Sequence, residues 1–283
     1  MSRNIYVRMG VAAPFDATHI LVTSPVLSPQ ALAIVRLVLA VYTFVALLFI
    51  LIWDGVKLHT ANSFFSYFTE LSYIGLCSYF WASGVQTFAY GFRIGGGHRK
   101  GYPLQHWPRP LQFLHVLLFS TITTFPFLVT IVYWVELSSS ATFSTRFNAW
   151  SNISIHALNS VFALFEILLT HAGPTPWSHI PFIIILLAGY LGIAYITHAT
   201  QGFYTYSFLD PAKEHGKLAG WIVGIAVGGA IIFSITRTMC YLRERILARY
   251  GRGSGSVVSR SGSVMSQRTE EWETVERPGS RLV

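Results

Sequence analysis

The chain has 283 residues, of which 52% are hydrophobic and only 11% are charged. A soluble domain of this length carries roughly a quarter charged residues, so the composition excludes an ordinary soluble protein and predicts an integral membrane protein. The net charge of +8 lies mostly in loops and in the tail, without a basic-aromatic patch, so we expect no nucleic-acid partner. Cys77 and Cys240 both lie in apolar segments, which argues against a disulfide framework.

Residues 1–29 have no compact basic-then-apolar signal, so we interpret them as a retained N-terminal segment on the cytoplasmic side. Six later segments are long enough to cross roughly 30 Å of hydrocarbon, and short Gly-, Pro-, Ser- and His-rich connections separate them. The sequence therefore predicts an all-α polytopic membrane protein whose transmembrane domain covers residues 30–245. The expected helices lie near 31–53, 65–90, 111–135, 149–169, 180–199 and 218–242.

Lys and Arg concentrate on one side of this bundle, which places both termini in the cytoplasm of an endoplasmic reticulum or plasma membrane protein. The larger set comprises Arg3, Arg8, Arg93, Arg99, Lys100, Arg109, Arg243, Arg245, Arg249 and Arg252, and the smaller comprises Lys57, Arg146, Lys213 and Lys217. Arginines from Arg237 to Arg249 are spaced to contact an anionic leaflet. Residues 246–283 are too polar to pack, so we expect a disordered cytoplasmic tail.

The fourth expected span carries polar groups that are costly in a membrane unless they have partners. Asn152, His156 and Asn159 have the i, i+4, i+7 spacing of one helix face, which predicts a stripe directed toward other helices or a wet cavity. Glu166 lies deeper and is expected to be paired or protonated, with Arg36 or Arg237 as partner; depth favours Arg237.

Four stretches bring polar side chains to one level near the outer surface if both termini are cytoplasmic. They carry Thr69, His156, Thr197 with His198, and Asp210 in the following loop. A threonine hydroxyl becomes a nucleophile when a neighbouring base takes its proton, and histidine suits that role. The alternative is that the threonine bonds its own helix and that the imidazoles join helices or bind a substrate.

Metal and phosphate sites are not indicated. His156 and His198 supply two ligands without a third, so we expect no metal and no cofactor. The glycines after Arg93 follow no strand and precede no Lys-Ser/Thr pair, so we interpret that loop as a flexible cytoplasmic turn.

Three motifs resemble the androgen-induced-gene family of multipass membrane threonine hydrolases. The segment Phe65-Ser-Tyr-Phe-Thr-Glu-Leu-Ser-Tyr is similar to the Thr-bearing second span, and Trp150-Ser-Asn-Ile-Ser-Ile-His-Ala-Leu-Asn-Ser-Val to the His-bearing span, nearest the rolling stone branch. Residues 202–210 are similar to the family's Gly-x-x-x-Tyr-Pro-x-Leu-Asp/Glu ending, with Ser207 in place of proline. The resemblance covers residues 30–245 and implies cleavage of fatty acid esters of hydroxy fatty acids by Thr69 and His156.

Our leading hypothesis is accordingly an intramembrane lipid ester hydrolase with a Thr69 nucleophile and a His156 base. Asn152, Asn159, His198 and Asp210 are the candidates to bind substrate, orient the base or stabilise the oxyanion. A lipid or fatty acyl ester is the expected partner. The alternative is a non-enzymatic lipid-binding or interaction protein of the rolling stone type, and a transporter ranks third because no paired broken helices occur.

Overall fold

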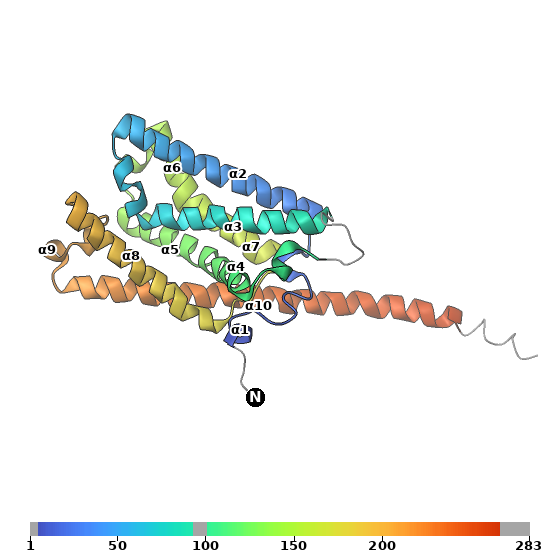
Figure 1. The fold of residues 1–283 in the computed structure, drawn as a ribbon. Coiled ribbons are helices and arrows are strands. Elements are labelled where there is room, and N and C mark those ends of the chain that lie inside the picture. Colours follow the sequence, from blue (N-terminus) through green and yellow to red (C-terminus); the bar gives the residue numbers. More distant parts are fainter. Residues whose placement is uncertain (1–4, 93–100, 267–283) are drawn as a thin grey trace, which may run out of the picture. The chain divides into compact units, whose positions relative to one another are not determined.

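A computed structural model describes residues 5–92 and 101–266, with side chains described as far as residue 249. The chain divides into two units, Met1–Tyr241 and Leu242–Val283. The first unit holds nearly all of the helices (Figure 1), and no strand occurs in the ranges that the structure describes. Five helical stretches are long and apolar enough to cross a membrane, and they indicate an integral membrane protein.

Capping residues, proline and glycine mark the ends of two long helices. The first long helix, α2 (Pro29–Trp53), starts at Ser28, whose hydroxyl accepts a hydrogen bond from the Ala31 N–H, with proline at the first helical position. The helix α8 (Ile180–Gln201) ends at Gly202, whose φ of 79° is the left-handed conformation that glycine adopts freely. Both helices match the expected spans within a few residues.

Two other membrane-length stretches are composite. Arg109–Leu137 consists of α4 (Arg109–Ile122), α5 (Phe125–Val132) and the π-helix η5 (Tyr133–Leu137). Arg146–Leu169 consists of α6 (Arg146–Ile153), the π-helix η7 (Ser154–Leu158) and α7 (Asn159–Leu169). A third π-helix, η2 (Asp54–Leu58), follows α2. Wide π-turns of this kind are frequent at functional sites.

The helix α3 (Phe68–Gly91) is the second of the six expected spans, but its composition is more polar than that of the five membrane-length stretches. It lies beside α2 (Figure 1), and small residues permit the close approach. A methyl group added at Gly91 would lie 3.0 Å from the Pro29 carbonyl carbon, so the end of α3 packs directly on the backbone at the start of α2.

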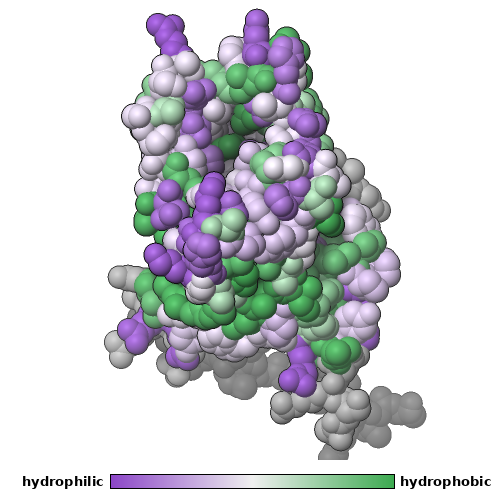
Figure 2. Space-filling model, turned by 90° about the vertical axis from the view of Figure 1, so that its left-hand side faces the viewer, coloured by the Kyte–Doolittle hydropathy of each residue, from purple (hydrophilic) through white to green (hydrophobic). Residues whose placement is uncertain are grey.

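Short helices connect the long ones. They are η3 (Ala61–Ser66), η4 (Pro103–His106), η6 (Ser140–Phe143), η8 (Trp177–His179), η9 (Ser207–Leu209) and α9 (Pro211–Glu214). Hydrophobic residues gather in a broad band on the face of the molecule seen in Figure 2, with hydrophilic residues standing out above the band. The long helices of Figure 1 end at this face, so it contains helix ends and connecting segments.

The N-terminal segment is built into the fold, which the sequence did not predict. It contains α1 (Ile5–Arg8) and η1 (Ile20–Val22), and Val11, Phe15 and Val22 are part of the main hydrophobic cluster. Residues 1–4 and the loop 93–100, with its expected flexible turn, lie outside the described residues.

The last helix, α10 (Lys217–Ser266), is helical through residues 246–266, where the sequence predicted a disordered tail. Low apolar content argues against packing, but it does not by itself prevent a backbone from forming helical hydrogen bonds. The remainder of the expected tail, 267–283, lies outside the described residues.

Candidate functional site

A cavity of about 200 Å³ lies inside the first unit, and its wall is mostly apolar. Residues from the start of α3, from α5 and η5, from α8, from the 206–209 loop and from α10 line it. The residues with polar side chains on this wall are Thr69, Tyr133, Tyr190 and Tyr206. An apolar cavity with a few convergent polar groups is the usual form of a small-molecule site.

Thr69 lies in the first turn of α3, is 7% exposed and lines this cavity. The Tyr206 hydroxyl lies beside this turn. The same Tyr206 oxygen accepts a hydrogen bond of 3.2 Å from the N–H of Phe68. Because the first N–H groups of a helix have no partner within the helix, Tyr206 caps the turn that carries Thr69.

Further hydroxyls surround this turn. Tyr190 donates to the Ser66 carbonyl at 3.2 Å and lies 3.0 Å from the Thr205 hydroxyl. Thr197 donates to the Ser66 hydroxyl at 2.9 Å. The structure thus brings Thr197 and the turn before Thr69 into one hydrogen-bonded cluster.

His156 lies in η7, is 7% exposed and does not line the cavity. Its ring stacks on the Tyr133 ring, with centroids 3.5 Å apart and planes at 10°. Its Nδ1 lies 3.2 Å from the Asn152 carbonyl oxygen, and an oxygen acceptor requires the proton on Nδ1. In the neutral ring, the lone pair that can accept a proton is therefore on Nε2.

The structure does not join Thr69 to His156 by a hydrogen bond; both residues are described, and the Tyr133 ring links them indirectly. Tyr133 lines the same cavity as Thr69 on one side and stacks on His156 on the other. His156 therefore lies one aromatic ring away from the cavity that contains the Thr69 hydroxyl.

The two asparagines hold helices together, in contrast to the substrate-binding role predicted for them. The Asn152 amide donates to the Thr142 carbonyl at 3.2 Å, and its own carbonyl orients His156. The Asn159 amide oxygen accepts from the Thr130 hydroxyl at 3.1 Å, and its nitrogen donates to the Pro126 carbonyl at 3.4 Å. The side chains of the predicted stripe thus contact the 126–142 segment.

His198 and Asp210 also lie off the cavity wall. His198 stacks on Tyr204 at 3.9 Å, and its buried Nδ1 has no hydrogen-bond partner. Asp210 accepts from the Ala212 N–H at 2.9 Å and lies 3.7 Å from the Lys213 ammonium, so it caps α9. Neither residue lines the cavity, although the sequence indicated both as candidates for the site.

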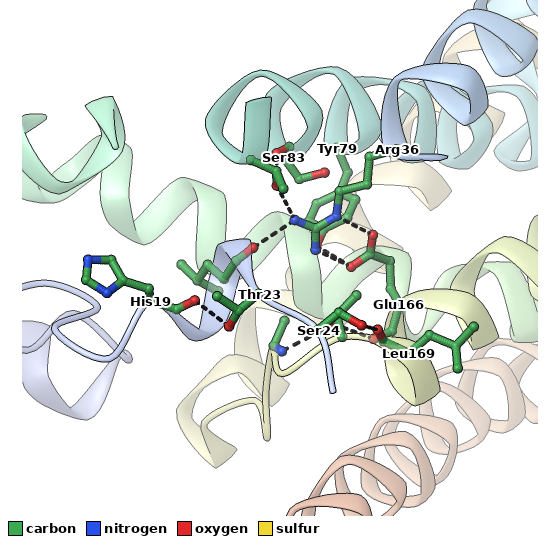
Figure 3. Close-up of polar contacts among 12 residues, drawn as sticks. His19, Thr23, Ser24, Arg36, Tyr79, Ser83, Glu166 and Leu169 are labelled. Atoms are coloured by element: carbon green, nitrogen blue, oxygen red, sulfur yellow. Dashed lines mark hydrogen bonds and ion pairs between the residues drawn. The ribbon is translucent and has the colours of Figure 1, made fainter. Parts of the chain in front are cut away.

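Glu166 pairs with Arg36, and the expectation that Arg237 would be its partner was wrong. Arg36 donates to both carboxylate oxygens, at 2.8 and 2.7 Å, and both side chains are 0% exposed (Figure 3). Tyr79 donates to the same carboxylate at 2.9 Å. Depth along the membrane does not fix helix rotation, and Arg237 instead lies over the Trp177 ring, 4.6 Å from its centroid.

The remaining Arg36 contacts tie the N-terminal segment to the bundle. One Arg36 nitrogen donates to the Leu21 carbonyl at 2.8 Å and to the Thr87 hydroxyl at 2.6 Å. Figure 3 shows Thr23 and Ser24 of that segment close to the ion pair, and the Ser24 hydroxyl donates to the Leu169 carbonyl at 2.6 Å.

Two hydroxyl–imidazole contacts that sequence reasoning missed occur away from the cavity. Ser120 and His179 Nδ1 are 2.7 Å apart, both fully buried, and His179 Nε2 lies 3.1 Å from the Met9 carbonyl. Thr23 and His171 Nδ1 are 3.0 Å apart. Both contacts attach the N-terminal segment or its neighbours to the helices, and no spacing pattern in the sequence links these distant residues.

Among the described residues, no three His, Cys, Asp or Glu side chains are arranged to hold a metal ion. Comparison of the chain with protein-family models, with curated proteins and with solved structures gives no match. Any function must therefore be argued from the cavity and the side chains around it.

Proposed function

We propose that this protein is a multipass membrane hydrolase of acyl esters, with fatty acid esters of hydroxy fatty acids or similar lipids as substrates. The observation that carries the proposal is the position of Thr69 on the wall of a mostly apolar cavity. An acyl chain would occupy the apolar part of the cavity and present its ester to the hydroxyl end. The resemblance of three sequence motifs to the membrane threonine hydrolases agrees with this reading.

In the proposed reaction, the Thr69 oxygen attacks the ester carbonyl carbon and His156 Nε2 takes the hydroxyl proton. The carbonyl π electrons move to oxygen, and collapse of the tetrahedral intermediate expels the alcohol, which receives the proton from His156. Water then hydrolyses the acyl-threonine, with His156 again as base. The ring of Tyr133 must move aside for this step, and catalytic hydrogen bonds often tighten only when substrate is bound.

The topology proposed with this activity has six spans, which are the five membrane-length stretches together with α3, and it has both termini in the cytoplasm. The excess of Lys and Arg in the loops assigned to the cytoplasmic side supports this orientation. An endoplasmic reticulum or plasma membrane location is compatible with a substrate whose chains remain in the bilayer.

Hydrolysis of a fatty acid ester of a hydroxy fatty acid by purified protein in detergent tests the proposal. Thr69→Ala and His156→Ala should each abolish turnover while size-exclusion profiles and melting curves remain near wild type. Thr200→Ala and His106→Ala are matched controls, because both residues are exposed and Thr200 bonds only its own helix through the Ile196 carbonyl. Full turnover by a folded Thr69→Ala variant would refute the assignment.

A second function, acyl-lipid binding without chemistry, is favoured by one observation: no hydrogen bond joins the described Thr69 and His156 side chains. In that case the wild-type protein would bind the ester stoichiometrically and release it unchanged. His156→Ala would then reduce stability, because His156 contacts Tyr133 and the Asn152 carbonyl.

A further inference from the structure

Tyr206 lines the same cavity as Thr69, although it lies in a loop 137 residues later in the chain. It precedes η9, lines the cavity and caps the α3 turn through the Phe68 N–H. Its ring stacks on Phe208, with centroids 5.1 Å apart and planes at 9°, and meets Tyr67 edge-on at 6.0 Å. These aromatic contacts fix the direction of the phenol.

The hydrogen bond from Phe68 determines what the Tyr206 proton can do. Because the Tyr206 oxygen accepts from that N–H, its own proton remains available to donate to a different acceptor. Burial raises the pKa of Tyr206 well above its ordinary value of 10.0, so the phenol stays protonated at neutral pH. Tyr206 is therefore a hydrogen-bond donor and not a base.

We infer that Tyr206 is a further catalytic residue, the donor that stabilises the oxyanion formed when Thr69 attacks an ester carbonyl. The inference rests on the proposed function. As the Thr69 oxygen–carbon bond forms, the carbonyl π electrons move to oxygen, and the Tyr206 O–H donates a hydrogen bond to that oxygen without transferring its proton. The Thr69 proton goes to His156 as before, so the step balances without another reactant.

A purely structural role as helix cap predicts a different outcome from an oxyanion donor. Loss of the cap would lower the melting temperature with little change in turnover by the folded protein. Loss of an oxyanion donor lowers kcat by about 100-fold to 1,000-fold and leaves substrate binding nearly unchanged. The ratio of the effect on kcat to that on KM therefore separates the two roles.

The experiment compares Tyr206→Phe with Tyr204→Phe, a matched tyrosine two residues away that stacks on His198 and does not line the cavity. We expect Tyr206→Phe to lose about 100-fold or more in kcat, with KM and binding of the ester close to wild type. Tyr204→Phe should keep wild-type turnover. A folded Tyr206→Phe variant with kcat near wild type would overturn the inference while leaving the hydrolase proposal intact.

A second measurement serves if Tyr206→Phe does not fold or if the wild type shows no turnover. The infrared carbonyl stretch of a ¹³C-labelled ester bound to the Thr69→Ala variant reports a hydrogen bond to the carbonyl directly. A stretch at lower frequency than that of the same ester in lipid supports the Tyr206 donor, and an unshifted stretch overturns it. Absence of wild-type turnover with a shifted stretch would count against the hydrolase proposal and not against the donor.

Discussion

The buried ion pair between Arg36 and Glu166 makes a sharp prediction about stability. Two charge-assisted hydrogen bonds join the side chains, and neither side chain is exposed. Removing one partner leaves the other charge buried without compensation, which costs about 3–5 kcal/mol. Glu166→Gln should therefore lower the melting temperature by on the order of 10 °C on the scale of soluble domains of similar size.

The double variant Arg36→Met/Glu166→Met removes both charges together. It still leaves the Leu21 carbonyl and the Tyr79 hydroxyl without their partners, at about 1–3 kcal/mol each. We nevertheless expect the double variant to lose less stability than the sum of the losses in Arg36→Met and Glu166→Met, by about 3 kcal/mol or more. The reason is that the double variant leaves no unpaired charge buried.

A thiol-reactive fluorophore is a suitable assay, because the Cys77 and Cys240 thiols are buried and become reactive on unfolding. Purified variants would be heated in detergent with the fluorophore, with Lys57→Met as the control that removes an exposed cation. Strictly additive losses in the double variant, or a Glu166→Gln melt equal to wild type, would show that the ion pair does not stabilise the bundle as argued.

Two further predictions concern other parts of the first unit. Gly91→Ala should destabilise the protein by forcing α3 away from the Pro29 backbone. A methyl group at Gly75 meets no atom within 4 Å, so Gly75→Ala should be neutral or stabilising by up to about 1 kcal/mol. Thermal melts in which Gly91→Ala is the more stable variant would contradict the packing described. Burial raises the pKa of Asp16 above its ordinary value of 3.8, so its stabilising contribution is present in acid and is lost as pH rises through the folded pKa. Asp16→Asn should flatten the rise in melting temperature on acidification from neutral pH toward pH 4, and an unchanged pH profile would exclude this role for Asp16.

The positions of the long helices followed from the sequence because runs of about twenty apolar residues have few alternatives. The observed α2 begins two residues before the expected span and both end at Trp53, while α8 starts at the expected Ile180. Pro29 and Gly202 lie at observed helix ends, in the positions that proline and glycine favour.

The contacts between helices were harder to predict, because hydropathy does not set rotation about a helix axis. Depth alone favoured Arg237 over Arg36 as the partner of Glu166, and the structure pairs Arg36. The π-helix η7 has no recognisable signature in the sequence, yet it contains His156 and affects how this helix packs against residues 126–142. For the same reason the sequence could not show whether Thr69 and His156 are in contact, and no hydrogen bond joins these two described residues in the structure.

The N-terminal segment escaped prediction for a different reason. Its attachment uses backbone carbonyls of Met9 and Leu21, which carry no residue-specific signal. Tyr206 belonged to a motif noted in the sequence, but its proximity to Thr69 depends on how the 202–210 loop folds back over α3.

The most direct test of the central claim is to look for an acyl group on Thr69 during turnover. Wild-type protein mixed with a fatty acid ester of a hydroxy fatty acid would be quenched in acid within the first turnover, digested and analysed by mass spectrometry. The account predicts the fatty acyl mass on the peptide that contains Thr69, and none in the Thr69→Ala variant. Product formation with the acyl group on another residue, such as Ser120 beside His179, would contradict it.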